Sequence, residues 1–466
     1  MKKFLITLLV AALLASALVF SASAAGYQET AEQLSELGLL QGSDGDFQLG
    51  RQPTRAEAIT MLVRLLGLEE EARSGEYSHP FTDAPDWASP YIAIAYELGY
   101  TTGATETTFE PQGICSSQMY VTFVARALGY SDDDVATTLW AESLDFGKAI
   151  GIIDDILLSD ASFMRGHMAV VSYLALSVRP ASGMYDTLLQ KLVDDGAVDA
   201  ADAARQLERF ALIDEFLQIG SELQDVTSIA MVCEMSMDMT MMGMTIPMYV
   251  FLDAKVIVDD FDLDCAMAME MSAPNTDGEM ETQSTEMYMT DGYIYVSAEG
   301  EKVKMPLDSA LGGMSMEDLL AMTDLAESLA PVAVYPSYMI SSITKGTAGA
   351  GLTLYTVEFS SDVFNGLVAQ IFGMLGDVGM GELGGLDGIY VDNVVVKFYT
   401  RPTGELNRMQ LSADMAMSIM GFDAYASMDF DYSIYAKGAD VIIEFPDDLD
   451  EYIELDVLHE MMQDLV

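Results

Sequence analysis

The stretch Pro53-Thr54-Arg55-Ala56-Glu57, with the run 58–66 that follows it, decides the fold of the first part of this 466-residue chain. Apolar side chains recur in that run at helical spacing, at Ile59, Leu62, Val63 and Leu66. Thr54 and Glu57 stand three residues apart, which is typical of a capping box, where each side chain accepts a hydrogen bond from the other residue's backbone N–H. The stretch therefore predicts a helix that begins beside Thr54.

Arg55 is the residue of this stretch that helix capping does not explain, because a cation in the first turn opposes the helix dipole. Its planar guanidinium suits bidentate contact with a carboxylate. Between residues 26 and 180 there are seven arginines and a single lysine. We expect Arg55 to contact an anionic ligand; the alternative is a solvated or ion-paired arginine.

The stretch belongs to a unit that recurs over the first 180 residues. Self-comparison gives these matches: 37–42 with 98–103, 64–67 with 126–129, and a third, weaker copy around Trp140, Phe163 and Arg165. Each copy predicts a helix that ends at a glycine, a polar turn and a second helix. In the second copy Ser116 keeps the helix cap without the arginine and the acid. The third copy keeps Arg165, and we expect it to lack both cap partners.

These repeats resemble the S-layer homology family. The matching segments are the turn at 37–47, Thr54-Arg55-Ala56-Glu57, and Phe81-Thr82-Asp83 with Trp87-Ala88. The resemblance implies an all-α N-terminal domain in which three repeats pack with pseudo-threefold symmetry. We place the repeats at 26–68, 79–131 and 138–180, the last one degenerate.

The same resemblance implies non-covalent binding to pyruvylated cell-wall polysaccharide. It assigns Arg55 to the acidic sugar and gives Thr54 and Glu57 the role of shaping the site. Arg165 is the matching arginine of the third copy. Trp87 is expected to stack on a sugar ring; the alternative is a buried side chain that anchors its helix.

Composition and the first residues predict an exported acidic protein. Lys2 and Lys3 precede the apolar run 4–20, and Ala22-Ser23-Ala24 fits a cleavage site, so we expect a signal peptide over 1–24. An uncleaved membrane anchor is the alternative. The formal net charge of −53 repels nucleic acid and anionic surfaces unless a local basic site holds them. We expect a secreted, extracellular protein associated with the cell wall or S-layer.

The hydrophobic period changes in the second half of the chain. Residues 184–222 form a helical connector with a break at Asp194-Asp195-Gly196, either a plain spacer or the first helix of the next domain. From Val226 the period is two, with turn signals between runs. We therefore predict an α+β domain over 223–466, with a large antiparallel curved sheet covered by helices at 316–329 and 362–375.

Methionine dominates the predicted strands, since 28 of the 34 methionines follow residue 227. Alternation at strand period places them on the core face, without any need for the soft copper or silver site that thioethers suit. A third interpretation is a pliable apolar pocket. The strand-rich half resembles the lipoprotein-carrier half-barrel in segments 286–296, 302–306 and 441–446. That resemblance implies a lipid or other apolar ligand.

The sequence contains no recognisable catalytic, cofactor or metal motif. Three histidines stand far apart, and acidic runs such as Asp132-Asp133-Asp134 lack EF-hand spacing, so we interpret them as solvated turns rather than calcium sites. We expect Cys233 and Cys265 to be buried free thiols rather than a disulfide.

We therefore expect a non-catalytic cell-envelope protein without cofactor, held on wall polysaccharide by its repeats and binding an apolar or lipid-like ligand in its C-terminal domain. The alternative is a structural or adhesive surface-layer component that binds no small molecule. A third hypothesis is an envelope hydrolase that uses carboxylates.

Overall fold

The computed structural model describes residues 27–42, 46–159, 162–219, 226–259, 262–275, 277–298, 300–307, 336–359, 386–419 and 422–454. They divide into a helical unit, which runs to Ile213 and includes Pro336–Ser341, and a sheet unit made of the remainder from Asp214 onward. The expected signal peptide and the expected covering helices, 316–329 and 362–375, lie outside the described residues.

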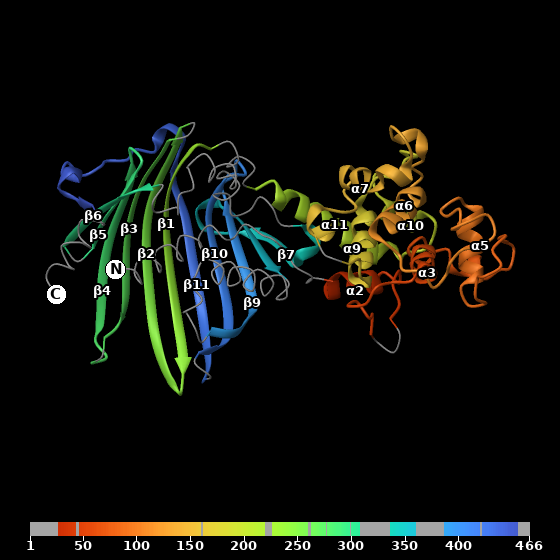
Figure 1. Cartoon of the computed structure of the whole chain (residues 1–466), viewed down its shortest axis with the longest axis horizontal. Coiled ribbons are helices and arrows are strands. Elements are labelled where there is room, and N and C mark those ends of the chain that lie inside the picture. Colours follow the sequence, from red (N-terminus) through yellow and green to blue (C-terminus); the bar gives the residue numbers. More distant parts are fainter. Residues whose placement is uncertain are drawn as a thin grey trace. The chain divides into compact units, whose positions relative to one another are not determined.

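Each predicted copy forms a pair of helices in the helical unit (Figure 1). The pairs are α2 (Tyr27–Glu36) with α3 (Arg55–Leu65), α5 (Ser89–Glu97) with α6 (Ser117–Ala127), and α7 (Leu139–Ala149) with α9 (Arg165–Ser177). The first helix of every pair ends beside a glycine whose φ is positive: Gly38 at 75°, Gly99 at 77° and Gly151 at 81°. Glycine adopts this backbone without a Cβ clash, so the predicted C-caps are confirmed.

The capping box predicted at α3 is confirmed. The backbone N–H of Glu57 donates to Thr54 Oγ1 at 3.3 Å, and the backbone N–H of Thr54 donates to Glu57 Oε2 at 2.9 Å. Ser116 caps α6 as predicted, accepting from the backbone N–H of Met119 at 3.2 Å. The expectation for α9 was wrong in one respect. His167 Nδ1 accepts from the backbone N–H of Met164 at 2.8 Å, so an imidazole takes the place of the missing carboxylate.

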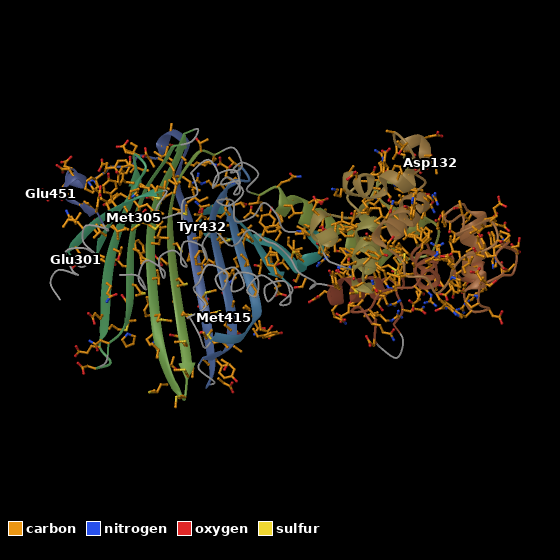
Figure 2. All side chains as sticks on the ribbon, in the orientation of Figure 1. Asp132, Glu301, Met305, Met415, Tyr432 and Glu451 are labelled. Atoms are coloured by element: carbon orange, nitrogen blue, oxygen red, sulfur yellow. The ribbon has the colours of Figure 1, made fainter. Side chains whose placement is uncertain are left out.

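The remaining helices are short except the last. They are α4 (Glu69–Ala72), α8 (Asp155–Ser159), α10 (Leu188–Asp194) and α11 (Ala200–Leu217), with a 3₁₀ turn at Asp132–Asp134, where Figure 2 labels Asp132. The break predicted at 194–196 is confirmed, because α10 ends there and Gly196 has a φ of 75°. Arg209 of α11 donates to the carbonyl of Ser341 at 2.9 Å, which ties Pro336–Ser341 to the helical unit. Among the described helices, none combines the length and apolar composition that a membrane crossing requires.

In the described residues, twelve strands form one sheet in the order β12-β6-β5-β4-β3-β2-β1-β11-β10-β9-β8-β7. Their bounds are β1 (Ser228–Met241), β2 (Met244–Asp259), β3 (Asp262–Pro274), β4 (Met280–Thr290), β5 (Tyr293–Ala298), β6 (Glu301–Pro306), β7 (Ile340–Thr347), β8 (Thr353–Phe359), β9 (Leu386–Thr400), β10 (Leu406–Ile419), β11 (Phe422–Lys437) and β12 (Ile453–Glu454). The long central strands pair antiparallel and lie side by side in a curved sheet (Figure 1), as predicted, while β12 joins β6 in parallel.

The register confirms that alternate residues divide between two faces. Cys233 of β1 stands opposite both Leu252 and Tyr432, and Leu252 stands opposite Met269. We call this side, which also carries the labelled Met415 and Met305 of Figure 2, the methionine face. The side that carries their sequence neighbours is the polar face.

The three cysteines are buried and unpaired, as expected for Cys233 and Cys265. Burial raises the pKa of the Cys233 and Cys265 thiols, and that of Cys115, to about 12. A thiol with so high a pKa stays protonated near neutral pH and is a poor nucleophile.

Candidate functional site

The stretch Pro53–Glu57 joins the first copy to the second. The backbone N–H of Arg55 donates to the carbonyl of Gly113 at 2.8 Å, and that of Cys115 donates to Pro53 at 2.9 Å. The Arg55 side chain follows the same path, its Nε donating to the carbonyl of Phe109 at 2.8 Å. The start of α3 is therefore fastened to the polar turn of the next copy.

The third copy is fastened to the first in the same manner. The backbone N–H of Arg165 donates to the carbonyl of Arg51 at 2.9 Å, and its Nε donates to the carbonyl of Phe47 at 3.0 Å. Phe47 and Phe109 occupy matching positions of the repeat, so Arg55 and Arg165 play equivalent parts in two joints. A resemblance read from sequence does not reveal this joining role, because both partners are backbone carbonyls.

Arg55 is only 8% exposed. Its guanidinium lies 4.9 Å from the Phe109 ring centroid, and Nη1 donates to the sulfur of Met119 at 3.0 Å. Burial lowers the pKa of Arg55, against the opposing charges of Glu110 and Asp83. Most of this side chain is therefore engaged in packing, which is neither the solvated nor the ion-paired state considered from sequence.

Two arginines surround Glu57 at the joint of the first and third copies. Arg51 Nη1 donates to Glu57 Oε2 at 2.9 Å, and Arg51 Nη2 binds the other carboxylate oxygen. Arg165 Nη1 lies 3.9 Å from Glu57 Oε1. Burial alone raises the pKa of Glu57, but the hydrogen bonds from Arg51 and the Thr54 backbone, with both guanidinium charges, lower it to about 2.

This cluster holds two guanidinium groups against one carboxylate, which leaves an excess positive charge. The side chain of Arg51 is 43% exposed and that of Arg165 is 15% exposed. Arg51 also donates from Nε to Gln48 Oε1 at 2.7 Å and from Nη1 to the carbonyl of Gln52 at 3.3 Å, so its Nη2 keeps an N–H for a ligand. In a chain of net charge −53, such a place suits an anionic ligand. The sequence analysis did not identify Arg51 as a site residue. Its position in the polar turn after Phe47, in a repeat with few basic residues, could have indicated a role in binding.

Trp87 is 51% exposed, so the alternative of a buried anchor is wrong, and its ring is open to a ligand. The neighbouring Asp83 accepts hydrogen bonds from the backbone N–H groups of Phe109 and Glu110, both at 2.8 Å. Trp140, at the matching position of the third copy, is 45% exposed. Among the described residues, no group of three or more His, Cys, Asp or Glu side chains is arranged to hold a metal ion.

Two protein families match parts of the chain. Residues 80–116 match the S-layer homology domain, and residues 216–331 match a family of unknown function (DUF6612). The chain therefore carries an S-layer homology domain, as its repeats indicated.

Characterised relatives match over limited stretches. A surface layer protein of Brevibacillus choshinensis is 34% identical over 109 residues, and a cell surface protein of Thermoanaerobacter kivui is 31% identical over 189 residues. These stretches are 23% and 36% of this chain, and 10% and 24% of the relatives. An endoglucanase of Bacillus sp. (strain KSM-635) is 34% identical over 83 residues, 18% of this chain and 8% of the enzyme. The chain thus spans about a tenth of the Brevibacillus relative.

Among solved structures, LprF from Mycobacterium bovis matches 51% of this chain and 97% of its own, at 12% identity and a TM-score of 0.26. A DUF1329 family protein from Desulfovibrio piger matches 53% and 98%, at 10% identity and a TM-score of 0.15. These TM-scores are too low to assign a fold, so the fold of the sheet unit is defined by its own strand order. The homology domain and the surface-protein relatives identify a secreted, cell-wall-associated protein.

Proposed function

We propose that this wall-associated protein attaches to pyruvylated cell-wall polysaccharide through the cluster of Arg51, Glu57 and Arg165, and acts without catalysis. The observation that carries the proposal is the pair of guanidiniums around one carboxylate, with Arg51 43% exposed. A pyruvyl group presents a carboxylate, which accepts a charge-assisted hydrogen bond from the N–H of Arg51 Nη2 that Glu57 leaves free and is attracted by the second guanidinium.

The neighbouring residues take supporting roles in this proposal. Glu57 holds Arg51 and Arg165 in place, and Thr54 fixes Glu57 through the capping box. Arg55 contributes by holding the turn of the second copy, since its Nε binds the Phe109 carbonyl. The exposed ring of Trp87 offers a face on which a sugar can stack.

The test is co-sedimentation of the full chain with purified pyruvylated wall polysaccharide. We expect Arg51→Ala and Arg165→Ala each to weaken binding by roughly tenfold or more, the order expected for one charge-assisted hydrogen bond. Arg179→Ala is the matched control, because the Arg179 side chain is 63% exposed and lies outside the cluster. Unchanged binding by the Arg51/Arg165 double variant would rule out the proposed site, and so would equal binding to polysaccharide stripped of pyruvyl groups.

For the sheet unit we propose an apolar or lipid-like ligand on the methionine face. Its core is the cluster of Cys233, Leu252, Ala254 and Met269. Met231, Val250, Met267, Met287 and Phe430 pack against that cluster and are only partly buried. Pliable, partly buried thioether side chains suit a ligand of variable apolar shape.

Two neighbours on β3 give a matched pair for this proposal. Met267 belongs to the methionine face and Ala268 to the polar face, where it is exposed. With the neutral fluorophore N-phenyl-1-naphthylamine, we expect Met267→Lys to lose most of the binding and Ala268→Lys to retain it, because a charge on the apolar face must be desolvated. Urea unfolding of both variants checks that the fold is retained. Bare protein in native mass spectrometry, together with no fluorophore binding by the wild type, would favour a purely structural or adhesive role.

A further inference from the structure

The polar face of the sheet carries a groove of about 580 Å³ that neither proposed ligand occupies. It lies on the side opposite the methionine face and within the sheet unit. Its floor is the backbone of β1, β2, β10 and β11, where Met235, Val250, Leu411 and Phe430 stand in one cross-strand row and turn their side chains to the other face.

The strand register builds one wall of the groove from a single row across six strands. Directly paired residues run from β3 to β9 as Glu270, Phe251, Glu234, Asp431, Gln410 and Lys397. Neighbouring strands lie roughly 4.8 Å apart, so this row spans about 24 Å. The groove is therefore long enough for a chain molecule.

The second wall is the next row of the same face. It contains Ser272, Tyr249, Ser236, Asp429 and Ser412, again paired directly from strand to strand. Tyr249 and Phe251 are two residues apart on β2, so both rings project from the polar face, one in each wall. Tyr249 is 51% exposed and Phe251 is 38% exposed. They add an apolar strip to a groove whose other polar-face side chains are charged or polar, which favours a ligand with an apolar surface.

The carboxylates of the groove differ in their partners. Asp431 is held by Arg408, whose Nε donates at 2.7 Å, and by Gln410, whose Nε2 donates at 2.8 Å. Glu234, Glu270 and Asp429 make no hydrogen bond or ion pair with any described residue. Carboxylates accept hydrogen bonds and donate none. The groove thus presents free acceptors, with serine hydroxyls that can also donate.

We propose that this groove binds an extended chain of uncharged sugars. Sugar hydroxyls supply the donors that Glu234, Glu270 and Asp429 lack, and the apolar face of a pyranose ring packs on Tyr249 and Phe251. The unpaired carboxylates repel acidic polymers, so the ligand differs from the pyruvylated polysaccharide proposed for the helical unit. The Arg408 guanidinium binds Asp431 beside Glu234, in the middle of the row, and Lys397 stands at its β9 end. These two cations interrupt the row of carboxylates and disfavour a polycation of regular charge. The full chain then holds two kinds of polysaccharide at once.

The experiment is isothermal titration of the full chain with chitohexaose and with cellohexaose, two soluble uncharged β-linked oligosaccharides. We expect binding to at least one of them, and a loss of tenfold or more in the Tyr249→Ser/Phe251→Ser variant. Tyr425→Ser is the matched control, because Tyr425 lies on the same face of β11, is 59% exposed and does not line the groove. It is expected to bind as the wild type does.

Four results would overturn the proposal. They are no binding of either oligosaccharide at millimolar concentration, an equal loss in the Tyr425→Ser control, tighter binding of octalysine than of both sugars, and binding of a hexagalacturonate as strong as that of the uncharged sugars. The Glu234→Gln variant distinguishes a sugar ligand from a basic peptide ligand. Its amide still accepts a hydrogen bond, so sugar binding is expected to fall by less than tenfold.

Discussion

At the scale of single residues, the stretch Thr54–Glu57 has two roles: it caps helix α3 and it joins the first copy to the second. Thr54 and Glu57 cap α3, and that role follows from their spacing alone. The role of Arg55 becomes clear only from the structure, where its side chain donates to the Phe109 carbonyl and the Met119 sulfur of another copy. Glu57 then serves twice, since its carboxylate completes the cap and also gathers Arg51 and Arg165.

This double role makes a pH-dependent prediction for Glu57→Gln. The folded state lowers the pKa of Glu57 from 4.5 to about 2, so its charge stabilises the fold fully above pH 4.5, and that contribution is lost as pH falls through 2. Glutamine can keep the cap hydrogen bond but loses the ion pairs. We expect the variant to be less stable by about 1–2 kcal/mol at pH 7, with the difference shrinking from pH 4.5 downward.

Tryptophan fluorescence during urea unfolding measures this, because both tryptophans, Trp87 and Trp140, lie in the helical unit. Glu70→Gln, at an exposed position of α4, is the control and is expected to unfold like the wild type. A stability difference between wild type and Glu57→Gln that stays constant from pH 7 to pH 2.5 would show that the ion pairs contribute nothing.

At the scale of elements, local signals were sufficient for most of the fold. Helical period, cap residues and glycine stops predicted the three helix pairs, and a period of two predicted the two faces of the strands. His167 was missed as a cap partner because an imidazole is not a usual acceptor at that position. The joints between copies could not be predicted from the sequence. Their acceptors are backbone carbonyls, such as those of Phe47 and Phe109, and every residue type has such a carbonyl.

The sheet shows the same limit in another form. Alternation placed the methionines on one face, but it left the other face as ordinary solvated residues. The groove there depends on which residues stand opposite each other across six strands, for example Glu234 between Phe251 and Asp431. Strand register over distances as great as that from β1 to β11 cannot be deduced from one sequence, because many pairings satisfy the same alternation.

At the scale of the whole molecule, a net charge of −53 sets the long-range field that any polymer meets first. The Arg51–Glu57–Arg165 cluster is a small positive exception that acts over a few ångströms. An acidic wall polysaccharide must therefore approach against repulsion before it reaches the attractive site. Most proteins that bind anionic polymers carry a net positive field, and their association slows as salt is added.

This protein is expected to behave in the opposite way. The Debye length falls from about 30 Å at 0.01 M salt to about 8 Å at 0.15 M, so added salt removes the long-range repulsion and leaves the short-range contacts with Arg51 and Arg165 largely intact. Surface plasmon resonance on immobilised pyruvylated polysaccharide should show the association rate constant rising by roughly tenfold over that range. Polysaccharide stripped of its pyruvyl groups is the control. It lacks the charge that the chain repels, so the association rate constant of any residual binding should vary little with salt. An association rate constant that falls with salt would mean that the local arginine cluster, and not the net charge of the chain, governs the approach of the polymer.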